Sequence, residues 1–373
     1  MTGGKVFMTG PYEGAPFGLS VVVPAKAGPF DLGTVVVRAK VEVDVHTAQL
    51  TVTTDPLPQI VGGVPVNLRL VNVTINRLNF TYNPTDCEPT SVSGTMTGGQ
   101  GAIAHLESHF QVTNCASLGF KPGFKASTSA KTSRKDGASL HVKLTYPKES
   151  IGRDANIALV KVELPKQLPS RLSTLQKACT AAQFESDPAG CPAASIVGHA
   201  KATTPILPVP LEGPAYFVSH GGEAFPSLIV VLQGYGVTVD LVGTTFISKQ
   251  GITSSTFKTV PDVPVESFEL TLPQGPDSAL AANADLCSPT KTKLVKKKVT
   301  VRSKVHGHTQ KREVTRRVRQ AVPTTLSMPT EFVAQNGVVL HQSTHIQVTG
   351  CPRVAASANV AKMKVGRGVT RRG

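Results

Sequence analysis

The sequence predicts an all-β protein built of tandem antiparallel β-sandwich domains, with one short helix and a projecting basic β-hairpin. Three observations support this prediction. Glycine and proline supply 33 and 28 of the 373 residues, and valine and threonine recur in most segments. Several segments alternate apolar and polar residues over the length of a strand. Turn formers combined with β-branched residues indicate many short strands joined by tight turns.

The chain is partly duplicated. Residues 341–351 (HQSTHIQVTGC) have a near copy at residues 105–115 (HLESHFQVTNC). The two copies also agree at four earlier places, so residues 1–115 repeat residues 210–351 in order. These matches are Gly10-Pro-Tyr12 with Gly213-Pro-Ala-Tyr216, Gly18–Val23 with Ser227–Leu232, Val64-Pro-Val66 with Val263-Pro-Val265, and Cys87–Thr90 with Cys287–Thr290.

The duplication predicts the domain organisation. Residues 1–115 are a truncated β-sandwich repeat unit, because they lack a counterpart of residues 123–209. Residues 116–135 are a linker, and residues 136–355 form the second unit or units. Residues 356–373 are a disordered basic tail. Met1 therefore falls inside a unit, and we expect the chain to begin part-way through a longer array.

Each expected element has its own local signal. Alternating apolar residues predict strands, and glycine-rich stretches at 98–101 and 335–337 predict hairpin turns. Pro169 and the N-cap candidate Ser170 begin one helix, 170–184, which places Leu172, Leu175, Cys179 and Ala182 on one face. The expected strands include 33–44, 66–75, 138–146, 156–164, 194–202 and 265–272.

Six cysteines give three local pairs, Cys87–Cys115, Cys179–Cys191 and Cys287–Cys351. Six cysteines permit fifteen pairings, and the repeat selects this one because two pairs occupy matching positions. As disulfides they would indicate an oxidising, extracellular compartment and add roughly 3 kcal/mol each. A metal site would need clustered ligands such as Cys-x-x-Cys, which the sequence lacks.

The N-terminus shows no signal peptide, because a basic start, an apolar core and a cleavage site do not follow one another there. We therefore expect a signal upstream of a truncated start. No uncharged apolar run reaches the ~20 residues of a membrane span.

Residues 291–322 are an insertion that the first copy lacks, and they hold most of the charge. Residues 291–319 carry +11 and residues 352–373 carry +6; subtracting both from the total of +15 leaves −2 for the rest. Valine alternates with lysine and arginine in 296–302 and 314–319, which predicts two strands joined by a turn at 306–310. The predicted polyanion-binding residues are Lys296, Lys297, Lys298, Arg302, Lys304, Lys311, Arg312, Arg316, Arg317 and Arg319.

The basic hairpin permits several partners. For an exported protein these are anionic cell-wall polymers, acidic polysaccharide and anionic lipid surfaces, with other repeats of the array as further contacts. Nucleic acid is also compatible with clustered cations, but the hairpin lacks aromatic residues for base stacking. The alternative without any partner is a solvated extension.

Candidate catalytic and metal-binding residues are few. His105/His109 and His341/His345 lie in alternating patterns, so each pair spans about 13 Å of strand, too far to share one metal ion. The stretch 219–222 (SHGG) resembles an oxyanion-hole loop, but no Gly-x-Ser-x-Gly accompanies it, and a glycine turn is the simpler interpretation. No Walker, dinucleotide or EF-hand motif is present, so we expect no cofactor and assign no catalytic residue.

Five stretches together carry a resemblance to a known kind of sequence: the Gly-Pro-Tyr pieces, residues 224–231 (AFPSLIVV), 257–265 (FKTVPDVPV), 164–170 (LPKQLPS) and the closing Gln-Val-Thr-x-Cys. The chain is similar to large, uncharacterised exported repeat proteins of high-GC soil bacteria. That resemblance implies immunoglobulin-like domains and an extracellular location. We therefore expect a secreted or cell-surface structural or adhesive module; the alternatives are an extracellular hydrolase with an inter-domain site and a nucleic-acid binder.

Overall fold

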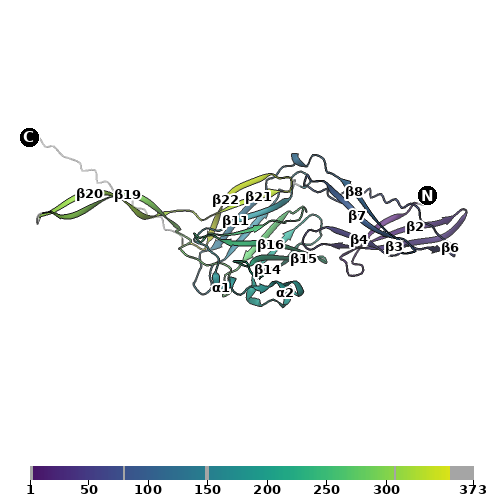
Figure 1. Cartoon of the computed structure of the whole chain (residues 1–373), viewed down its shortest axis with the longest axis horizontal. Coiled ribbons are helices and arrows are strands. Elements are labelled where there is room, and N and C mark those ends of the chain that lie inside the picture. The colour runs from purple at the N-terminus through teal and green to yellow at the C-terminus, as the bar shows by residue number, and fades with distance from the viewer. Residues whose placement is uncertain (1–2, 79, 148–150, 306–307, 353–373) are drawn as a thin grey trace, which may run out of the picture.

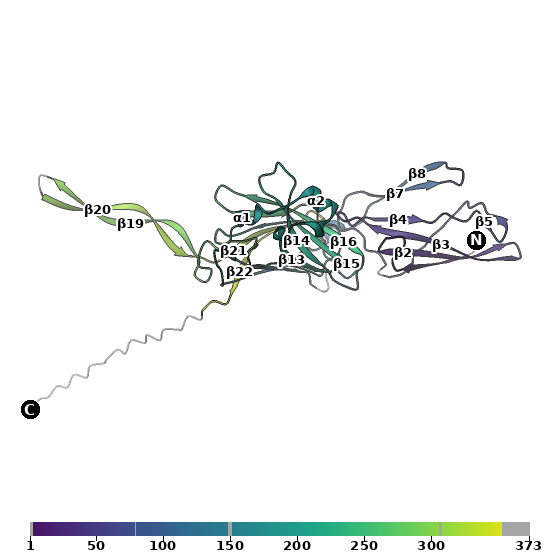
Figure 2. The same cartoon turned by 90° about the horizontal axis from the view of Figure 1, so that it is seen from below.

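The computed structural model describes residues 3–78, 80–147, 151–305 and 308–352. Strands make up 52% of the chain and helices 6%, which confirms the predicted all-β class. An open N-terminal unit is followed along the long axis by a closed barrel, and a hairpin projects from the opposite end of the barrel (Figure 1, Figure 2).

The N-terminal unit consists of one open sheet and two separate hairpins. The sheet has the order β1-β2-β3-β4, and all its neighbouring strands are antiparallel. In the part of the chain that the structure describes, β5–β6 and β7–β8 join no other strand. The bounds are β1 Lys5–Thr9, β2 Phe17–Ala27, β3 Phe30–Val43, β4 Leu50–Thr54, β5 Ile60–Val61, β6 Val64–Pro65, β7 Thr90–Thr97 and β8 Ile103–Phe110.

The second unit is a closed barrel of 11 strands. Its order is β14-β13-β18-β10-β9-β22-β21-β11-β17-β16-β15, and β15 pairs back onto β14. The bounds are β9 Gly123–Ser129, β10 Leu140–Thr145, β11 Ile157–Glu163, β13 Ile196–Thr203, β14 Leu211–Ser219, β15 Ser227–Gly234, β16 Val237–Ile247, β17 Thr253–Phe257, β18 Ser267–Leu272, β21 Ser327–Ala334 and β22 Val339–Thr349.

One neighbouring pair in this ring, β9 with β22, is parallel, and the others are antiparallel. A ring with an odd number of strands cannot alternate direction all the way round. Closing an 11-stranded barrel therefore requires at least one parallel pair. The pair β9–β22 meets that requirement.

The predicted tandem β-sandwich, immunoglobulin-like domains are wrong, because the sheet of the second unit closes on itself. Alternation along a strand fixes only that one of its faces is buried. A sandwich and a barrel meet that condition equally well. The pairing of Val218 with Ser227, and of Ala215 with Val230, joins the two ends of the sheet and makes the barrel.

The barrel core is apolar and continuous. Strand β21 buries every second residue, among them Met328 and Phe332, as the pleat of a half-buried strand requires. Strand β15 is buried from Ser227 to Leu232 because both of its faces are covered. Its inner residues join the main core, and its outer residues pack against the chain around Phe184.

The single helix predicted for 170–184 is wrong. The structure has two short helices, α1 Leu172–Leu175 and α2 Ala181–Ser186, separated by β12 Cys179–Thr180. The break follows from tertiary pairing, because β12 adds in parallel to the edge of β14. The side chain of Thr180 then caps α2 by accepting from the backbone N–H of Gln183. Within the described ranges, three short 3-10 segments lie at Cys115–Ser117, Pro188–Gly190 and Ala193–Ser195.

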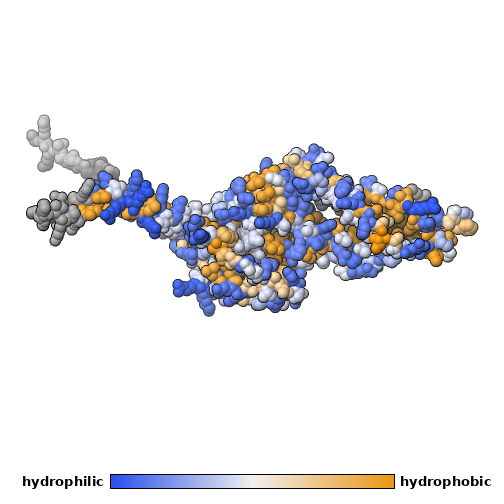
Figure 3. Space-filling view, viewed as in Figure 1, coloured by the Kyte–Doolittle hydropathy of each residue, from blue (hydrophilic) through white to orange (hydrophobic). Residues whose placement is uncertain are grey.

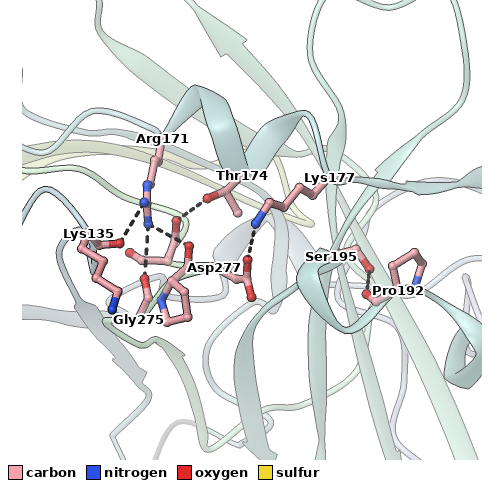
Figure 4. Close-up of polar contacts among 10 residues, drawn as sticks. Lys135, Arg171, Thr174, Lys177, Pro192, Ser195, Gly275 and Asp277 are labelled. Carbon is pink, nitrogen blue, oxygen red and sulfur yellow. Dashed lines mark hydrogen bonds and ion pairs between the residues drawn. The ribbon is translucent and has the colours of Figure 1, made fainter.

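Polar contacts fix α1 against the loop that follows β18 (Figure 4). The guanidinium of Arg171 donates to the carbonyl of Lys135 at 2.9 Å and to that of Gly275 at 3.3 Å. The Thr174 hydroxyl donates to the carbonyl of Ser278 at 2.8 Å, and both residues are buried. The contact of Thr174 satisfies a carbonyl group that would otherwise be buried without a partner, and those of Arg171 add links to two less buried carbonyls.

Two further predictions differ from the structure. Residues 116–135 do not remain a linker, because β9 (Gly123–Ser129) lies within them, between β10 and β22. Residues 66–75 form no strand. Their counterpart β18 is held between β10 and β13, and the described residues of the N-terminal unit include no copy of those two strands.

The three predicted cysteine pairs are the three disulfides of the structure. Cys87–Cys115, Cys179–Cys191 and Cys287–Cys351 close loops with sequence separations of 28, 12 and 64. None of the cysteines is free. The first disulfide belongs to the N-terminal unit, the second joins β12 to the turn after α2, and the third connects the base of the projecting hairpin to the end of β22.

The predicted basic hairpin is present and longer than expected. Strands β19 (Thr290–Val305) and β20 (His308–Pro323) extend past both predicted segments. Of the predicted turn 306–310, residues 306 and 307 lie outside the described residues, and His308–Gln310 belong to β20. The predicted disordered tail, 356–373, also lies outside the described residues.

Candidate functional site

The projecting hairpin is a two-stranded ribbon whose strands pair only with each other among the described residues. At ~3.3 Å per residue, strands of this length extend roughly 50 Å. Both views show the ribbon clear of the barrel (Figure 1, Figure 2), and its coloured surface is hydrophilic with hydrophobic patches between (Figure 3). Residues directly opposite each other lie on the same face of such a ribbon.

One face, here called the basic face, carries Lys296, Lys298, Arg317 and Arg319, all exposed, alongside Leu294, Thr300, Glu313 and Thr315. Lys296 lies opposite Arg317, which brings two positive charges together across the strands. The Nζ of Lys298 is 3.6 Å from a carboxylate oxygen of Glu313, and both side chains are well exposed to water. This ion pair is therefore worth less than about 1 kcal/mol.

The other face, here called the valine face, has Val295 opposite Val318 and Val299 opposite Val314. These four side chains are half-buried against one another. Between the two valine pairs lies an exposed cationic pair, Lys297 opposite Arg316. The hairpin thus carries positive charge on both faces.

The remaining predicted site residues are placed by the backbone register. Arg302 pairs with Lys311, Arg312 with Val301, and Lys304 with Thr309. The register therefore brings Lys296/Arg317 and Lys297/Arg316 together as cross-strand cationic pairs, and it also pairs the backbone of Arg302 with that of Lys311. Like charges directly opposite one another destabilise a two-stranded ribbon. A polyanion lying along the ribbon would remove that repulsion.

The base of the hairpin is fixed to the barrel. The Gln167 amide donates to the carbonyl of Thr290 at 3.1 Å. The backbone N–H of Thr324 donates to the carbonyl of Pro289 at 2.9 Å, which joins the two legs of the hairpin at its base. The Cys287–Cys351 disulfide lies next to these contacts in the sequence. The ribbon is consequently anchored at one end and exposed along its length.

The histidines are strand residues, as predicted. His105 and His109 belong to β8, and His341 and His345 belong to β22. The Nδ1 of His341 is 3.6 Å from a carboxylate oxygen of Glu331, on the adjacent strand. Among the described residues, no group of three or more His, Cys, Asp or Glu side chains could hold a metal ion.

The segment 219–222 forms a glycine turn. Gly221 and Gly222 have φ of 78° and 86°, a left-handed conformation that glycine adopts without strain. The carboxylate of Glu223 accepts from the backbone N–H of His220 at 2.8 Å, and the hydrogen bonds that it accepts lower its pKa. The geometry therefore matches a glycine turn and not an oxyanion-hole loop.

A cluster of polar residues joins the two units, and sequence reasoning missed it. The carboxylate of Asp262, in the barrel unit, accepts from the Thr85 hydroxyl at 2.7 Å and from the Asn156 amide at 2.8 Å. It also accepts from the backbone N–H groups of Thr85 and Asp86. Position 262 aligns with Gly63 in the first copy, so the repeat gave no signal for this carboxylate.

Asp86 lies beside this cluster with a less favourable environment. Burial, and then the negative charge of Asp262, raise the pKa of Asp86. Its Oδ1 is buried without a hydrogen-bond partner in the part of the chain that the structure describes. A perturbed carboxyl between two units is a feature that the hydrolase alternative would require. Here the neighbouring polar groups hydrogen-bond to one another and hold the units together.

Comparisons with family models, curated proteins and solved structures found no match to this chain. No helix in the described ranges is long and apolar enough to span a membrane. The three disulfides indicate an oxidising environment, consistent with a location outside the cytoplasm.

Proposed function

We propose that the protein is a structural or adhesive module, secreted or held at the cell surface, that binds an anionic cell-wall polymer or acidic polysaccharide through the β19–β20 hairpin. The observation that carries the proposal is the set of cross-strand cationic pairs on an exposed ribbon, above all Lys296/Arg317 and Lys297/Arg316. Repulsion within these pairs destabilises the free hairpin, and a bound polyanion would remove that repulsion.

The arrangement of charge favours a linear polymer over a flat lipid surface. Cations lie on both faces of the ribbon, so a plane could contact only half of them, whereas a flexible polymer can follow both. Among the exposed strand residues whose burial the structure describes, Leu294 is the large apolar one, which offers little to insert between lipids. Neutralising several charges along one polymer also predicts binding that weakens steeply with salt.

The test neutralises the two cationic pairs together, by Lys296→Gln, Lys297→Gln, Arg316→Gln and Arg317→Gln in the full chain. Binding to dextran sulfate is measured from low to high salt. We expect at least a tenfold loss of affinity at about 0.1 M salt and a shallower salt dependence, by roughly two to four in the log–log slope. The variant removes repulsion, so the hairpin keeps its register.

The matched control removes four exposed lysines from the body of the protein, by Lys26→Gln, Lys121→Gln, Lys249→Gln and Lys258→Gln. It has the same net charge as the hairpin variant, and we expect it to bind nearly as well as the parent. Equal losses in the two variants would show that net charge alone drives binding. Tighter binding to duplex DNA or to anionic phospholipid vesicles than to the polysaccharide would also contradict the proposal.

A further inference from the structure

The N-terminal unit has the strand registers of the barrel. Thr9 pairs with Gly18 just as Val218 pairs with Ser227, 209 residues later in both cases. The pairs β3–β4 and β7–β8 also correspond to β16–β17 and β21–β22, with other offsets: Lys40 pairs with Thr53 as Thr244 pairs with Thr256, and Ser91 pairs with His109 as Ser327 pairs with His345. The pair β2–β3 takes the place of β15–β16 between them. The two units therefore share one design at the level of individual residue pairs.

Two glycines confirm the register. A Cβ on Gly4 would meet the carbonyl oxygen of Val22, and a Cβ on Gly213 would meet that of Val231, again 209 residues later. Gly4, not Gly10, thus occupies the position of Gly213, which corrects the sequence match of Gly10-Pro-Tyr12. Both glycines permit the same close approach of two strand backbones.

Four barrel strands, β9, β10, β11 and β13, have no counterpart in the N-terminal unit, and all come from residues 123–203. In the barrel, β11 joins β17 to β21, β9 lies beside β22, and β13 lies beside β14. The matching strands β4, β7, β8 and β1 each lack that neighbour among the described residues. Their free edges expose backbone N–H and C=O groups in rows.

Core positions of the barrel are exposed at the matching places of β1, β7 and β8 in the N-terminal unit. Further hydrophobic surface of this unit shows around β2 to β4 (Figure 3). The exposed fractions are 38% for Val6 against 0% for Ala215, 57% for Met8 against 4% for Phe217, 65% for Val92 against 0% for Met328, 60% for Met96 against 0% for Phe332, and 43% for Phe110 against 0% for Ile346. Such apolar surface on one face marks an interaction site.

We propose that the N-terminal unit is an incomplete barrel that accepts a four-stranded polypeptide segment of the same design as residues 119–203. The segment would supply the equivalents of β9, β10, β11 and β13, close the sheet, and pair residues 66–75 on both sides. This proposal is independent of the anionic ligand proposed for the hairpin.

The free strand edges identify the occupant as polypeptide. Lipid or detergent would cover the exposed side chains but would not pair the backbone groups of β1, β4, β7 and β8. A second copy of the intact chain is also unsuited, because its own β9, β10, β11 and β13 are each paired on both sides within its barrel. Only a segment with this strand pattern satisfies both the edges and the apolar face.

The experiment adds a copy of residues 119–209 directly before Met1 of the full chain. This junction keeps the spacing of the barrel, since residue 4 corresponds to residue 213. In the fusion we expect hydrogen exchange of the β4 and β8 amides to slow at least 100-fold. The matched control carries Leu140→Asp and Leu144→Asp in the added copy alone, at two positions buried in the barrel, and we expect no added protection.

A cross-link tests the register of the added segment. In the barrel, Lys161 pairs with Thr256, whose counterpart in the N-terminal unit is Thr53. Lys161→Cys in the added copy should therefore form a disulfide with Thr53→Cys. It should not do so with Thr51→Cys, because two residues along a strand exceed disulfide reach.

Unchanged amide exchange in the fusion, or equal cross-linking to both positions, overturns the proposal. A parent protein that forms a stable dimer with protected β4 and β8 amides also overturns it, in favour of a second copy as the occupant. Exchange of the β15 amides serves as the internal check that the original barrel has folded.

Discussion

At the scale of single residues, one carboxylate makes several of the contacts between the units. Asp262 accepts four hydrogen bonds, three of them from Thr85 and Asp86 of the N-terminal unit. Hydrogen bonds to a charged group contribute about 1.5–3 kcal/mol each, and more is lost when one partner is removed. The same carboxylate makes the site unfavourable for a second negative charge, which Asp86 nevertheless carries when ionised.

Asp86 therefore gives a pH-dependent prediction. Its pKa is raised in the folded state, so folded protein binds the proton more tightly than unfolded chain does. The contribution of the group to stability is present below its unfolded pKa, near 4, and is lost as the pH rises through the folded pKa. We expect Asp86→Asn to stabilise the protein measurably at pH 7, and by progressively less toward pH 4.

Urea denaturation at a series of pH values measures this effect. Asp285→Asn is a suitable control, since Asp285 is exposed and accepts one hydrogen bond, from the backbone N–H of Cys287. Parallel stability curves for the parent and Asp86→Asn at every pH would show that burial beside Asp262 carries no cost.

At the scale of elements, strand register is set by residues that permit close backbone contact. Gly213 lies in β14, which is held between β13 and β15, so neither neighbour can move away from an added methyl group. Gly4 precedes β1, which is the edge of its sheet in the described chain. The same close backbone contact therefore occurs once in a strand held on both sides, at Gly213, and once beside an edge strand, at Gly4.

Alanine substitutions separate these two situations. We expect Gly213→Ala to destabilise the barrel by about 1–3 kcal/mol, the usual cost of overpacking, because its Cβ would overlap the Val231 carbonyl. Gly4→Ala should cost less than about 1 kcal/mol, because β1 can shift outward. Gly10→Ala, with no atom within 4 Å of the added Cβ, is the control. Equal losses at positions 4 and 213, measured by chemical denaturation, would contradict this account.

At the scale of the whole molecule, the two units differ in closure and not in local sequence pattern. The barrel has no free edge and a continuous core, whereas the N-terminal unit buries few apolar side chains, among them Ala39 and Val41. Buried apolar contacts and paired edges determine how often a region opens. The two units should therefore open with different free energies.

Native-state hydrogen exchange of the parent protein measures the difference on matched strands. The amides of β15 should exchange at least 100-fold more slowly than those of β2, a gap of about 2.7 kcal/mol in opening free energy. The two strands occupy equivalent places, each between two antiparallel neighbours, so a difference in exchange would not come from a difference in strand pairing. Indistinguishable protection would mean that closure of the barrel does not govern stability.

The sequence alone determined the all-β class, the three disulfides, the repeat and the basic hairpin, because each depends on local pattern or on spacing between matching residues. It did not determine whether the sheets stack or close, since alternation reports burial of a face and not the identity of the neighbouring strand. Tertiary pairing decided the rest. It paired β14 with β15 and formed strand β9 within the expected linker. It also replaced one expected helix by two helices on either side of β12. Residues 66–75 lack the partner strands that hold their counterpart, β18, in a sheet.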